Sequence, residues 1–314
     1  MEKRKRKNIS ASVRARLLNL AKAEQKNFNN VLLQYFQERF LYRLSVSPYR
    51  ENFILKGALL FLLYGAPRLR PTKDIDLLGR AQSNDLEQIR AVVQQIAQIE
   101  VPDGVVFTKE SATVEIIKEF EEYSGVRVKI EAKLTSARQT LQIDIGFGDR
   151  IVPGPVEIEF PVLLDQPAPR IKGYSKESVI AEKFEAIVRF NFLTSRMKDF
   201  YDILFLTKQE SFQMRILRQA IDATFHRRMT PLEDIAIIFT EEFKVQVDKQ
   251  EQWTAFLRRN HLESYGLFAS AVEQLQLFIE PVFQQPSDAV ENLWLSEVTN
   301  LPVRWSPDLW QWQS

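Results

Sequence analysis

Two aspartates separated by one apolar residue are the strongest sign of chemistry in this sequence. Asp74 and Asp76 flank Ile75 at the start of a short apolar run that is typical of a buried strand. On a strand, side chains two positions apart point to the same face, so both carboxylates would project together while Ile75 packs the other way. Like charges this close repel each other unless a cation neutralises them, and hard divalent cations prefer carboxylate oxygen. The triplet therefore predicts the core of a divalent-metal site.

A third carboxylate stands on another predicted strand. Asp144 lies between Ile143 and Ile145 in a run that alternates apolar and polar residues, which is typical of a half-buried strand. The same pattern also produces ordinary solvent-facing aspartates, so Asp144 alone is either a surface residue or a metal ligand. A neighbouring place in the sheet would bring it beside Asp74 and Asp76 and complete a site of three carboxylates.

Gly57-Ala58 precedes the aspartate pair by one predicted helix and one loop. A glycine at a loop-to-helix junction lets backbone N–H groups approach a phosphate closely, and a helix N-terminus favours its negative charge. Three carboxylates can hold two Mg²⁺ ions, one activating an attacking hydroxyl and the other binding a triphosphate. An Asp-x-Asp triplet is common by chance, and its combination with Gly57 is what favours nucleotide transfer.

The composition restricts the kind of metal site. The chain has 314 residues, no cysteine and two histidines, which excludes disulfides, zinc ribbons and thiol nucleophiles and leaves oxygen as the ligand atom. Mg²⁺ or Mn²⁺ is therefore expected. No apolar run reaches the ~20 residues of a membrane helix, and the basic N-terminus lacks the apolar stretch of a signal peptide. We expect a soluble cytoplasmic protein without a membrane partner.

The formal net charge of +1 conceals a basic N-terminus. Residues 1–50 hold twelve Lys and Arg against three Asp and Glu, a local balance of +9, and the run begins at residues 3–7. Such a segment is either a solvated tail or an arm that attracts a polyanion such as RNA through counterion release. Two further basic clusters, at residues 226–228 and 258–259, are either solvated surface or part of the same RNA-binding face.

The apolar periodicity predicts helices, then a mixed α/β core, then more helices. Ser10 and Ser12 are candidate caps of the first helix. Further helices are expected at 27–44, 58–64, 84–99, 178–192 and 199–206. Strands are expected around 75–78, 114–116, 126–131 and 141–145, and one more within the proline-rich link 153–169. The tryptophans near the C-terminus, including Trp294 and Trp305, are either core residues or, for one of them, a platform for an unpaired base.

This order predicts an α+β fold in which a small mixed sheet is flanked by helices. The expected division is a basic helical segment at 1–50, a catalytic core at 51–170 and a mostly helical domain at 171–314.

Three blocks of sequence resemble one family of enzymes. They are residues 53–60 with 70–79 (FILKGALL and RPTKDIDLLG), residues 178–184 (SVIAEKF) and residues 194–202 (TSRMKDFYD). In this order they closely resemble the AbiEii/AbiGii toxin family of nucleotidyltransferases, over residues 10–206. The C-terminal third adds little to the resemblance.

The resemblance implies a DNA polymerase β-like nucleotidyltransferase fold and Mg²⁺-dependent transfer of a nucleotide from an NTP to an acceptor hydroxyl. It also implies a toxin of a type IV toxin–antitoxin or phage-defence pair, with an antitoxin of the AbiEi type as partner. Some relatives add nucleotides to the 3′ end of tRNA, which makes tRNA the expected acceptor. Nucleotidylation of a protein side chain and a non-catalytic nucleotide- or RNA-binding module are the alternative functions.

The family motifs also imply roles for individual residues. Asp74 and Asp76 would bind the metal, Lys183 would contact the nucleotide phosphates, and Asp199 would be catalytic. Arg196 and Lys198 belong to the same final motif and would bind phosphate. Taken without the resemblance, Lys183 is a surface lysine paired with glutamates of its own helix, and Asp199 complements a helix dipole.

Two positions near the predicted site add to the family pattern. Many relatives have Gly-Gly or Gly-Ser where Gly57-Ala58 stands here, so Ala58 offers a backbone N–H to a phosphate but no hydroxyl. Thr72 lies two residues before Asp74, so we expect its hydroxyl close to the bound metal or phosphate. Modification of Thr72 would add negative charge beside the carboxylates and oppose the binding of metal and NTP.

Overall fold

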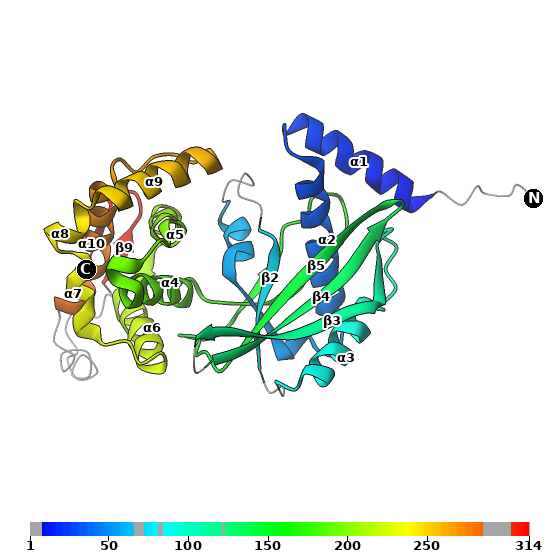
Figure 1. Cartoon of the computed structure of the whole chain (residues 1–314), viewed down its shortest axis with the longest axis horizontal. Helices are drawn as coiled ribbons and strands as arrows, with labels where there is room; N and C mark the ends of the chain where they lie inside the picture. Colours follow the sequence, from blue (N-terminus) through cyan, green and yellow to red (C-terminus); the bar gives the residue numbers. More distant parts are fainter. Residues whose placement is uncertain (1–7, 66–71, 81–83, 121–122, 285–302, 314) are drawn as a thin grey trace, which may run out of the picture. The chain divides into compact units, whose positions relative to one another are not determined.

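The computed structural model describes residues 8–65, 72–80, 84–120, 123–284 and 303–313. The basic run at residues 3–7, residues 70–71 of the first motif and Trp294 lie outside these ranges. The chain forms two compact units (Figure 1). The first comprises residues 1–148 and 156–173, and the second comprises residues 149–155 and 174–314.

A mixed sheet organises the first unit. Its strands are β1 (Phe53–Lys56), β2 (Asp74–Gly79), β3 (Val106–Phe120), β4 (Tyr123–Leu134), β5 (Ala137–Phe147), β6 (Val156–Glu159) and β7 (Arg170–Gly173). They lie in the order β3-β4-β5-β2-β1-β7-β6, with parallel pairing between β2 and β5 and between β1 and β7. The predicted small mixed sheet is confirmed.

Three helices and a 3₁₀ segment accompany this sheet. They are α1 (Ile9–Ala23), α2 (Phe28–Ser45), α3 (Leu86–Ala97) and the 3₁₀ helix η2 (Gly57–Tyr64); a short 3₁₀ turn, η1 (Arg50–Asn52), precedes β1. In Figure 1, α2 runs behind β4 and β5. Apolar residues of β2 and β5, such as Ile75 and Ile143, are fully buried, so strand alternation leaves Asp74, Asp76 and Asp144 on the opposite face.

The predicted caps of the first helix are wrong. Asn8 is the N-cap of α1, and its side chain accepts a hydrogen bond from the N–H of Ala11. Ser10 and Ser12 lie inside the helix, and the Ser10 hydroxyl instead donates to the carbonyl of Gly104 at 3.0 Å. Asparagine caps as well as serine does, so the residue two positions earlier satisfies the helix start and frees Ser10 for a tertiary contact.

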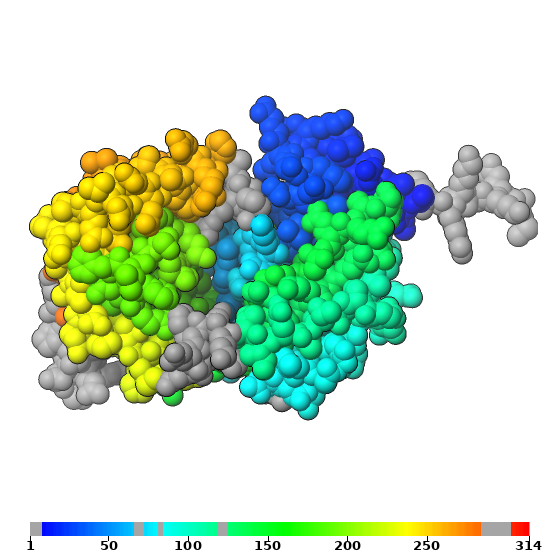
Figure 2. Space-filling model, in the orientation of Figure 1, coloured from blue at the N-terminus to red at the C-terminus, as the bar shows by residue number. Residues whose placement is uncertain are grey.

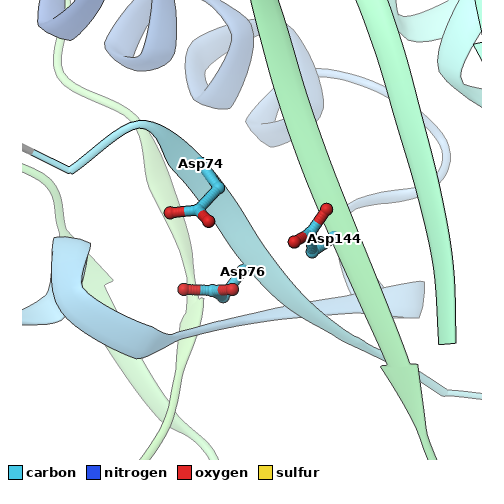
Figure 3. Close-up of side chains that lie close together, drawn as sticks. All are labelled: Asp74, Asp76 and Asp144. Carbon is cyan, nitrogen blue, oxygen red and sulfur yellow. The ribbon is translucent and has the colours of Figure 1, made fainter. Parts of the chain in front are cut away.

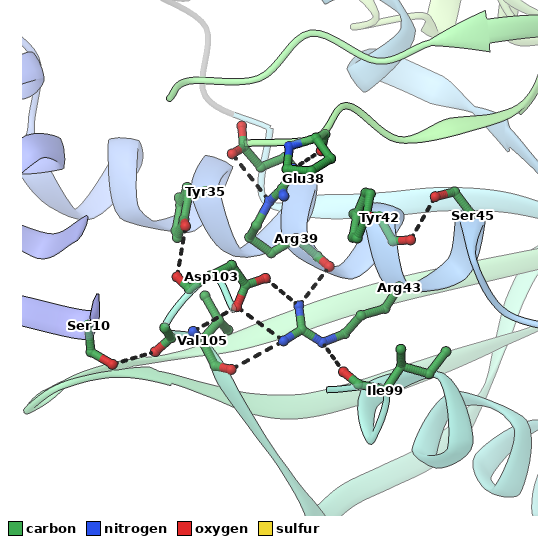
Figure 4. A network of polar contacts seen from close by, with 12 residues as sticks. Ser10, Tyr35, Glu38, Arg39, Tyr42, Arg43, Ser45, Ile99, Asp103 and Val105 are labelled. Atoms are coloured by element: carbon green, nitrogen blue, oxygen red, sulfur yellow. Dashed lines mark hydrogen bonds and ion pairs between the residues drawn. The ribbon is translucent and has the colours of Figure 1, made fainter. Parts of the chain in front are cut away.

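A buried polar network fixes α2 to the loop before β3 (Figure 4). The guanidinium of Arg43 donates to both carboxylate oxygens of Asp103, at 2.7 and 3.2 Å, and to the carbonyls of Ile99 and Val105. The hydroxyl of Tyr35 donates to the carbonyl of Asp103 at 2.9 Å. Because a buried charge is costly unless it is paired and hydrogen-bonded, this network sets the place of α2 on the sheet.

The same network changes the interpretation of the basic N-terminus. Arg39 and Arg43 are 0% and 2% exposed, so they belong to the core and do not contact a polyanion at the surface. Arg16 pairs with Asp165, and Arg50 pairs with Glu157. Several of the cations behind the local balance of +9 are therefore structural.

The second unit is mostly helical, as predicted. Its helices are α4 (Lys176–Phe190), α5 (Met197–Gln209), α6 (Met214–Arg227), α7 (Ile235–Ile238), α8 (Glu241–Lys244), α9 (Val247–Asn260) and α10 (Phe268–Gln284), with 3₁₀ turns η3 (Asn191–Leu193) and η4 (Leu232–Asp234). A small sheet of β8 (Phe212–Gln213), β9 (Arg304–Ser306) and β10 (Gln311–Gln313) was not predicted. Trp305 of β9 is 1% exposed and contacts Phe278 with ring centroids 4.9 Å apart, so this tryptophan is a core residue.

Candidate active site

The pairing of β2 with β5 brings the three predicted carboxylates together. Asp76 lies directly opposite Asp144 in the parallel ladder, and Asp74 lies opposite Gln142. One oxygen from each of Asp74, Asp76 and Asp144 lies within 4.8 Å of the others (Figure 3). Oxygens that share one ion at bond lengths of about 2.0–2.6 Å are separated by distances of this order. The donor set of carboxylates alone fits a hard divalent cation.

Gly57 borders this cluster through its backbone. Its φ is +73°, a conformation that favours glycine, and a Cβ at this position would lie 1.9 Å from Oδ2 of Asp76. No other residue type fits there without displacing the carboxylate. Ala58 follows Gly57 within η2. The sequence predicted a loop-to-helix junction here, whereas in the structure strand β1 runs directly into a 3₁₀ helix.

Two cations stand at the ends of the carboxylate row. Arg127 of β4 is the cross-strand partner of Asp144, and Lys56 of β1 is the partner of Asp76. Arg127 donates two hydrogen bonds to Asp144, at 2.8 and 2.7 Å, and this bond to Asp144 raises the pKa of the guanidinium. Lys56 is 8% exposed, and a Cβ on Gly146 of β5 would lie 3.6 Å from its Nζ. Arg127 borders the carboxylates from β4, whereas the side chain of Lys56 reaches from β1 toward β5.

Side chains of two neighbouring residues constrain Asp144. It is 9% exposed, and Gln142 adds a third hydrogen bond to its Oδ2 at 3.1 Å. Bidentate pairing fixes the plane of a carboxylate as well as its position. The sequence predicted Asp144 as a site residue but not Arg127. The sequence showed Arg127 only as one of the polar residues that alternate with apolar ones at residues 126–131.

Thr72 lies just before β2, at the predicted distance of two residues from Asp74. It is half-buried, and its carbonyl accepts a hydrogen bond from the side chain of Gln37 at 3.0 Å. This bond attaches the start of β2 to α2.

The residues of the later motifs form a second charged cluster, in the second unit. Lys183 of α4 donates to Asp199 at 2.8 Å and to Asp202 at 2.7 Å, both on α5. Arg196 donates to the other oxygen of Asp199 at 2.5 Å. Lys183 therefore pairs with two aspartates of α5. The alternative drawn from the sequence was pairing with glutamates of its own helix, and it did not include these contacts.

Burial and charge oppose each other in this second cluster. Burial opposes the charged form of Lys183, but Asp199 and Asp202 outweigh it and raise the pKa of the ammonium. Burial likewise opposes ionisation of Asp199, but Lys183 and Arg196 outweigh it and lower the pKa from 3.8 to about 2. Lys183 and Asp199 are thus both charged at neutral pH. Lys198, in the first turn of α5, is exposed.

Lys249 of α9 supports the loop that carries Arg196. It is 2% exposed, and its ammonium donates to the carbonyls of Phe192 and Thr194 at 2.8 and 3.1 Å. Sequence reasoning missed this lysine, because nothing in residues 247–260 signals contact with a loop some 55 positions earlier.

The predicted basic clusters differ in character. Arg228 pairs with the buried Glu185 at 2.9 Å, and its side chain is only 12% exposed, so it is a structural residue. Arg258 and Arg259 are exposed at the end of α9.

Among the described residues, no helix is long and apolar enough to cross a membrane.

Comparisons with known proteins found similar solved structures and one matching family model. Among solved structures, JHP933 from Helicobacter pylori is 15% identical with a TM-score of 0.49, over 85% of this chain and 97% of that chain. MenT4, a nucleotidyltransferase toxin from Mycobacterium tuberculosis H37Rv, is 17% identical with a TM-score of 0.47, over 90% and 97%. No curated protein matches the chain. The family model of the nucleotidyl transferase AbiEii toxin of type IV toxin–antitoxin systems matches residues 39–271, and the chain therefore belongs to this family of nucleotidyltransferases.

Proposed function

We propose that this nucleotidyltransferase uses Asp74, Asp76 and Asp144 to hold Mg²⁺ or Mn²⁺ and transfers a nucleotide from an NTP to the 3′ end of a tRNA. The observation that carries the proposal is the convergence of the three carboxylates within 4.8 Å beside the backbone of Gly57. When bound, a divalent ion would supply positive charge for the phosphates and lower the pKa of the attacking hydroxyl. The family supports a cognate antitoxin as partner.

The transfer step requires the acceptor and the NTP to lie in line. The acceptor oxygen forms a bond to the α-phosphorus, and the bond from that phosphorus to the oxygen bridging the β-phosphate breaks, so pyrophosphate leaves with the electron pair. Asp144, whose orientation Arg127 and Gln142 fix, positions the hydroxyl and accepts its proton. Gly57 and Ala58 present backbone N–H groups to the phosphates.

The second cluster contributes to nucleotide handling in this proposal. The family motif assigns Lys183 to the nucleotide phosphates and Asp199 to catalysis, with Arg196 and Lys198 as phosphate contacts. Arg196 supports it, because its side chain is 38% exposed and Asp199 holds its guanidinium in one orientation. Pre-organised cations bind phosphate without the entropic cost of ordering long side chains.

One labelling experiment tests the reaction. Purified protein is incubated with Mg²⁺, total tRNA and each labelled NTP in turn, beside an Asp74→Asn/Asp76→Asn variant. Label is expected in tRNA, from one preferred NTP and only with intact carboxylates. Label in added cell protein would overturn the tRNA acceptor and favour nucleotidylation of a side chain. NTP binding without any transfer, under Mg²⁺ or Mn²⁺, would favour a binding module.

Thr72 is the proposed point of control. A negative charge here, two residues before Asp74, would compete with the binding of both metal and triphosphate. Thr72→Glu should therefore lose transfer activity on the order of a hundredfold, whereas the neutral Thr72→Gln of similar size should lose much less. Equal activity of the two variants would show that charge at this position is unimportant.

A further inference from the structure

A pocket in the first unit lies beside the carboxylate cluster and has a chemistry of its own. It encloses about 430 Å³ between the first turns of α2, the residue before β2 and the first half of β5. Figure 2 shows the N-terminal helices, in blue, bordering the strand region, in green, in this unit. Binding pockets for small molecules begin at about 300 Å³, so the volume suits a single nucleotide unit.

Amide and cationic side chains line the pocket together with apolar surface. The amides are those of Asn29, Asn30, Gln139 and Gln142, the cations are Lys73 and Arg138, and Leu33 and Thr140 complete the lining. No acidic residue is among the described residues that line the pocket. Arg138 is 72% exposed and lies 3.9 Å from Glu131, at the limit of an ion pair. Among the described residues, no carboxylate pairs with Lys73.

This combination favours a ribonucleotide of a polymeric chain. Asparagine and glutamine amides offer a donor and an acceptor side by side, which matches the edge of an unpaired base. Lysine and arginine neutralise phosphodiesters. The amide of Gln139 already donates to the carbonyl of Asn29 at 2.8 Å, so the strand and helix walls are held together before a ligand binds.

The pocket shares a wall with the carboxylates. Lys73 immediately precedes Asp74, and Gln142 is both the cross-strand neighbour of Asp74 and a hydrogen-bond donor to Asp144. Gly57 follows β1, on the other side of β2 in the strand order. If phosphates of the NTP lie at Gly57, the β5 side is where an acceptor must approach.

We infer that this pocket binds the terminal nucleotide of the RNA acceptor, with the amides contacting its base and with Lys73 and Arg138 contacting the adjoining phosphodiesters. The inference rests on the proposed transfer to an RNA 3′ end and adds to it the site that receives the acceptor. It assigns base preference at the acceptor end to Asn29, Asn30 and Gln139.

Binding without transfer provides the test. A short single-stranded oligoribonucleotide with a 5′ fluorescein and a free 3′ hydroxyl is titrated with the full chain in the absence of NTP, and Kd is measured by anisotropy at several salt concentrations. Lys73→Gln/Arg138→Gln should raise Kd on the order of tenfold and lower the slope of log Kd against log salt by about 0.7 per lost phosphate contact. Arg90→Gln/Arg170→Gln, which removes two exposed cations elsewhere in the first unit, should leave both values unchanged.

A second variant addresses the base contacts. Asn30→Ala should reduce discrimination among oligonucleotides that differ only in the terminal base, while the salt slope stays as in the unmodified chain. Binding of an NTP in the absence of RNA should stay within about twofold in all pocket variants, since the inference places the NTP elsewhere.

The possible outcomes separate this inference from the proposed function. An unchanged Kd in the Lys73→Gln/Arg138→Gln variant would overturn the pocket assignment, even if label still enters tRNA. A loss of NTP affinity equal to the loss of RNA affinity would make the pocket part of the NTP site and also overturn it. Pocket-dependent RNA binding without transfer would support the pocket and contradict the transferase proposal. If label enters protein, if this labelling is lost in the pocket variants, and if added RNA does not inhibit it, then the acceptor bound by the pocket is a protein and the RNA assignment is wrong.

Discussion

The two charged clusters of this molecule differ in the source of their positive charge. In the second unit, the ammonium of Lys183 lies between Asp199 and Asp202, at 2.8 and 2.7 Å. In the first unit, three carboxylates meet within 4.8 Å, and Arg127 pairs with Asp144 from the outer side of the row. One cluster thus has a cation between its two acids, whereas in the other Arg127 and Lys56 accompany three carboxylates whose oxygens a divalent ion fits.

This difference determines what each acid does for stability. Asp199 is 1% exposed and paired with two cations, so removing it would leave buried positive charge without compensation. Asp74 and Asp76 are half-buried and lie close to Asp144, so their mutual repulsion offsets part of what they contribute to the fold. Acids in the second cluster should support the fold more than acids in the first, which should chiefly support ligand binding.

The largest expected effect is the loss of transfer in Asp74→Asn/Asp76→Asn. Activity should fall about a thousandfold or more, because metal ions contribute several kcal/mol of charge stabilisation in such sites. The free energy of unfolding without metal should fall less than it does in Asp199→Asn. Urea titrations with and without Mg²⁺ should show that Mg²⁺ stabilises the unmodified chain and leaves the variant unaffected. Asp248→Asn/Asp308→Asn, two exposed aspartates of the second unit, is the matched control.

A fall in stability of the Asp74→Asn/Asp76→Asn variant in metal-free buffer as large as that of Asp199→Asn would contradict the comparison. It would mean that these carboxylates are held by partners within the fold, as Asp199 is.

The next effect in size is destabilisation by Asp199→Asn. Breaking a buried pair from one side costs about 3 kcal/mol or more, and the cost should depend on pH. Because the pKa of Asp199 is lowered from 3.8 to about 2 in the folded chain, its contribution is present above pH 4 and is lost as pH falls toward 2. The difference in unfolding free energy between the unmodified chain and Asp199→Asn, measured by urea titration, should therefore shrink over that range.

Asp222→Asn is the control for this measurement. Asp222 pairs with Arg218 four residues earlier on α6 and is 42% exposed, so its loss should cost about 0.5 kcal/mol or less. An equal loss in both variants would show that the second cluster has no special role in the fold.

Local sequence signals predicted the strands but not the contacts of their polar residues. Strict alternation at residues 126–131 and 141–145 predicted β4 and β5, and the Asp74 to Asp76 spacing placed both carboxylates on one face. The partner of each carboxylate depends on register. The pairing of Asp76 with Asp144 joins positions 68 residues apart, and the pairing of Asp144 with Arg127 depends on the β4–β5 hairpin. The periodicity of a single strand does not determine either register.

The second unit shows the same limit more strongly. Its helices follow from periodicity, with boundaries shifted by about two residues, for example Lys176–Phe190 where 178–192 was predicted. The strands β8 and β9 are two and three residues long and pair across some 90 positions. No local pattern identifies so short a strand, and the family resemblance, which ends near residue 206, did not extend to it.

The close approach of Gly57 to Asp76 gives a steric prediction for the first unit. Gly57→Ala should reduce transfer about a hundredfold, because the new methyl would displace Asp76 and a shift of about 1 Å in a reacting site has an effect of that size. Gly65→Ala is the matched control, since Gly65 has nearly the same φ, +72°, but has nothing within 4 Å of the added Cβ. Steady-state labelling rates distinguish the two. Equal losses would attribute the effect to backbone strain, and the contact with Asp76 would then be unimportant.

The smallest expected effect concerns the support of the second cluster. Lys249→Met removes two hydrogen bonds to the carbonyls of Phe192 and Thr194, and should lower the free energy of unfolding by about 1–3 kcal/mol. Hydrogen exchange should accelerate in residues 191–198, while the Lys183 ion pairs persist, because α4 and α5 also pack directly against each other. Lys244→Met, which removes an ion pair with Glu241 one turn away on its own helix, should leave exchange in that loop unchanged. Faster exchange across the whole of α5 in Lys249→Met would instead show that Lys249 holds the ion pairs themselves, and that the second cluster depends on an outside support much as Asp144 depends on Arg127.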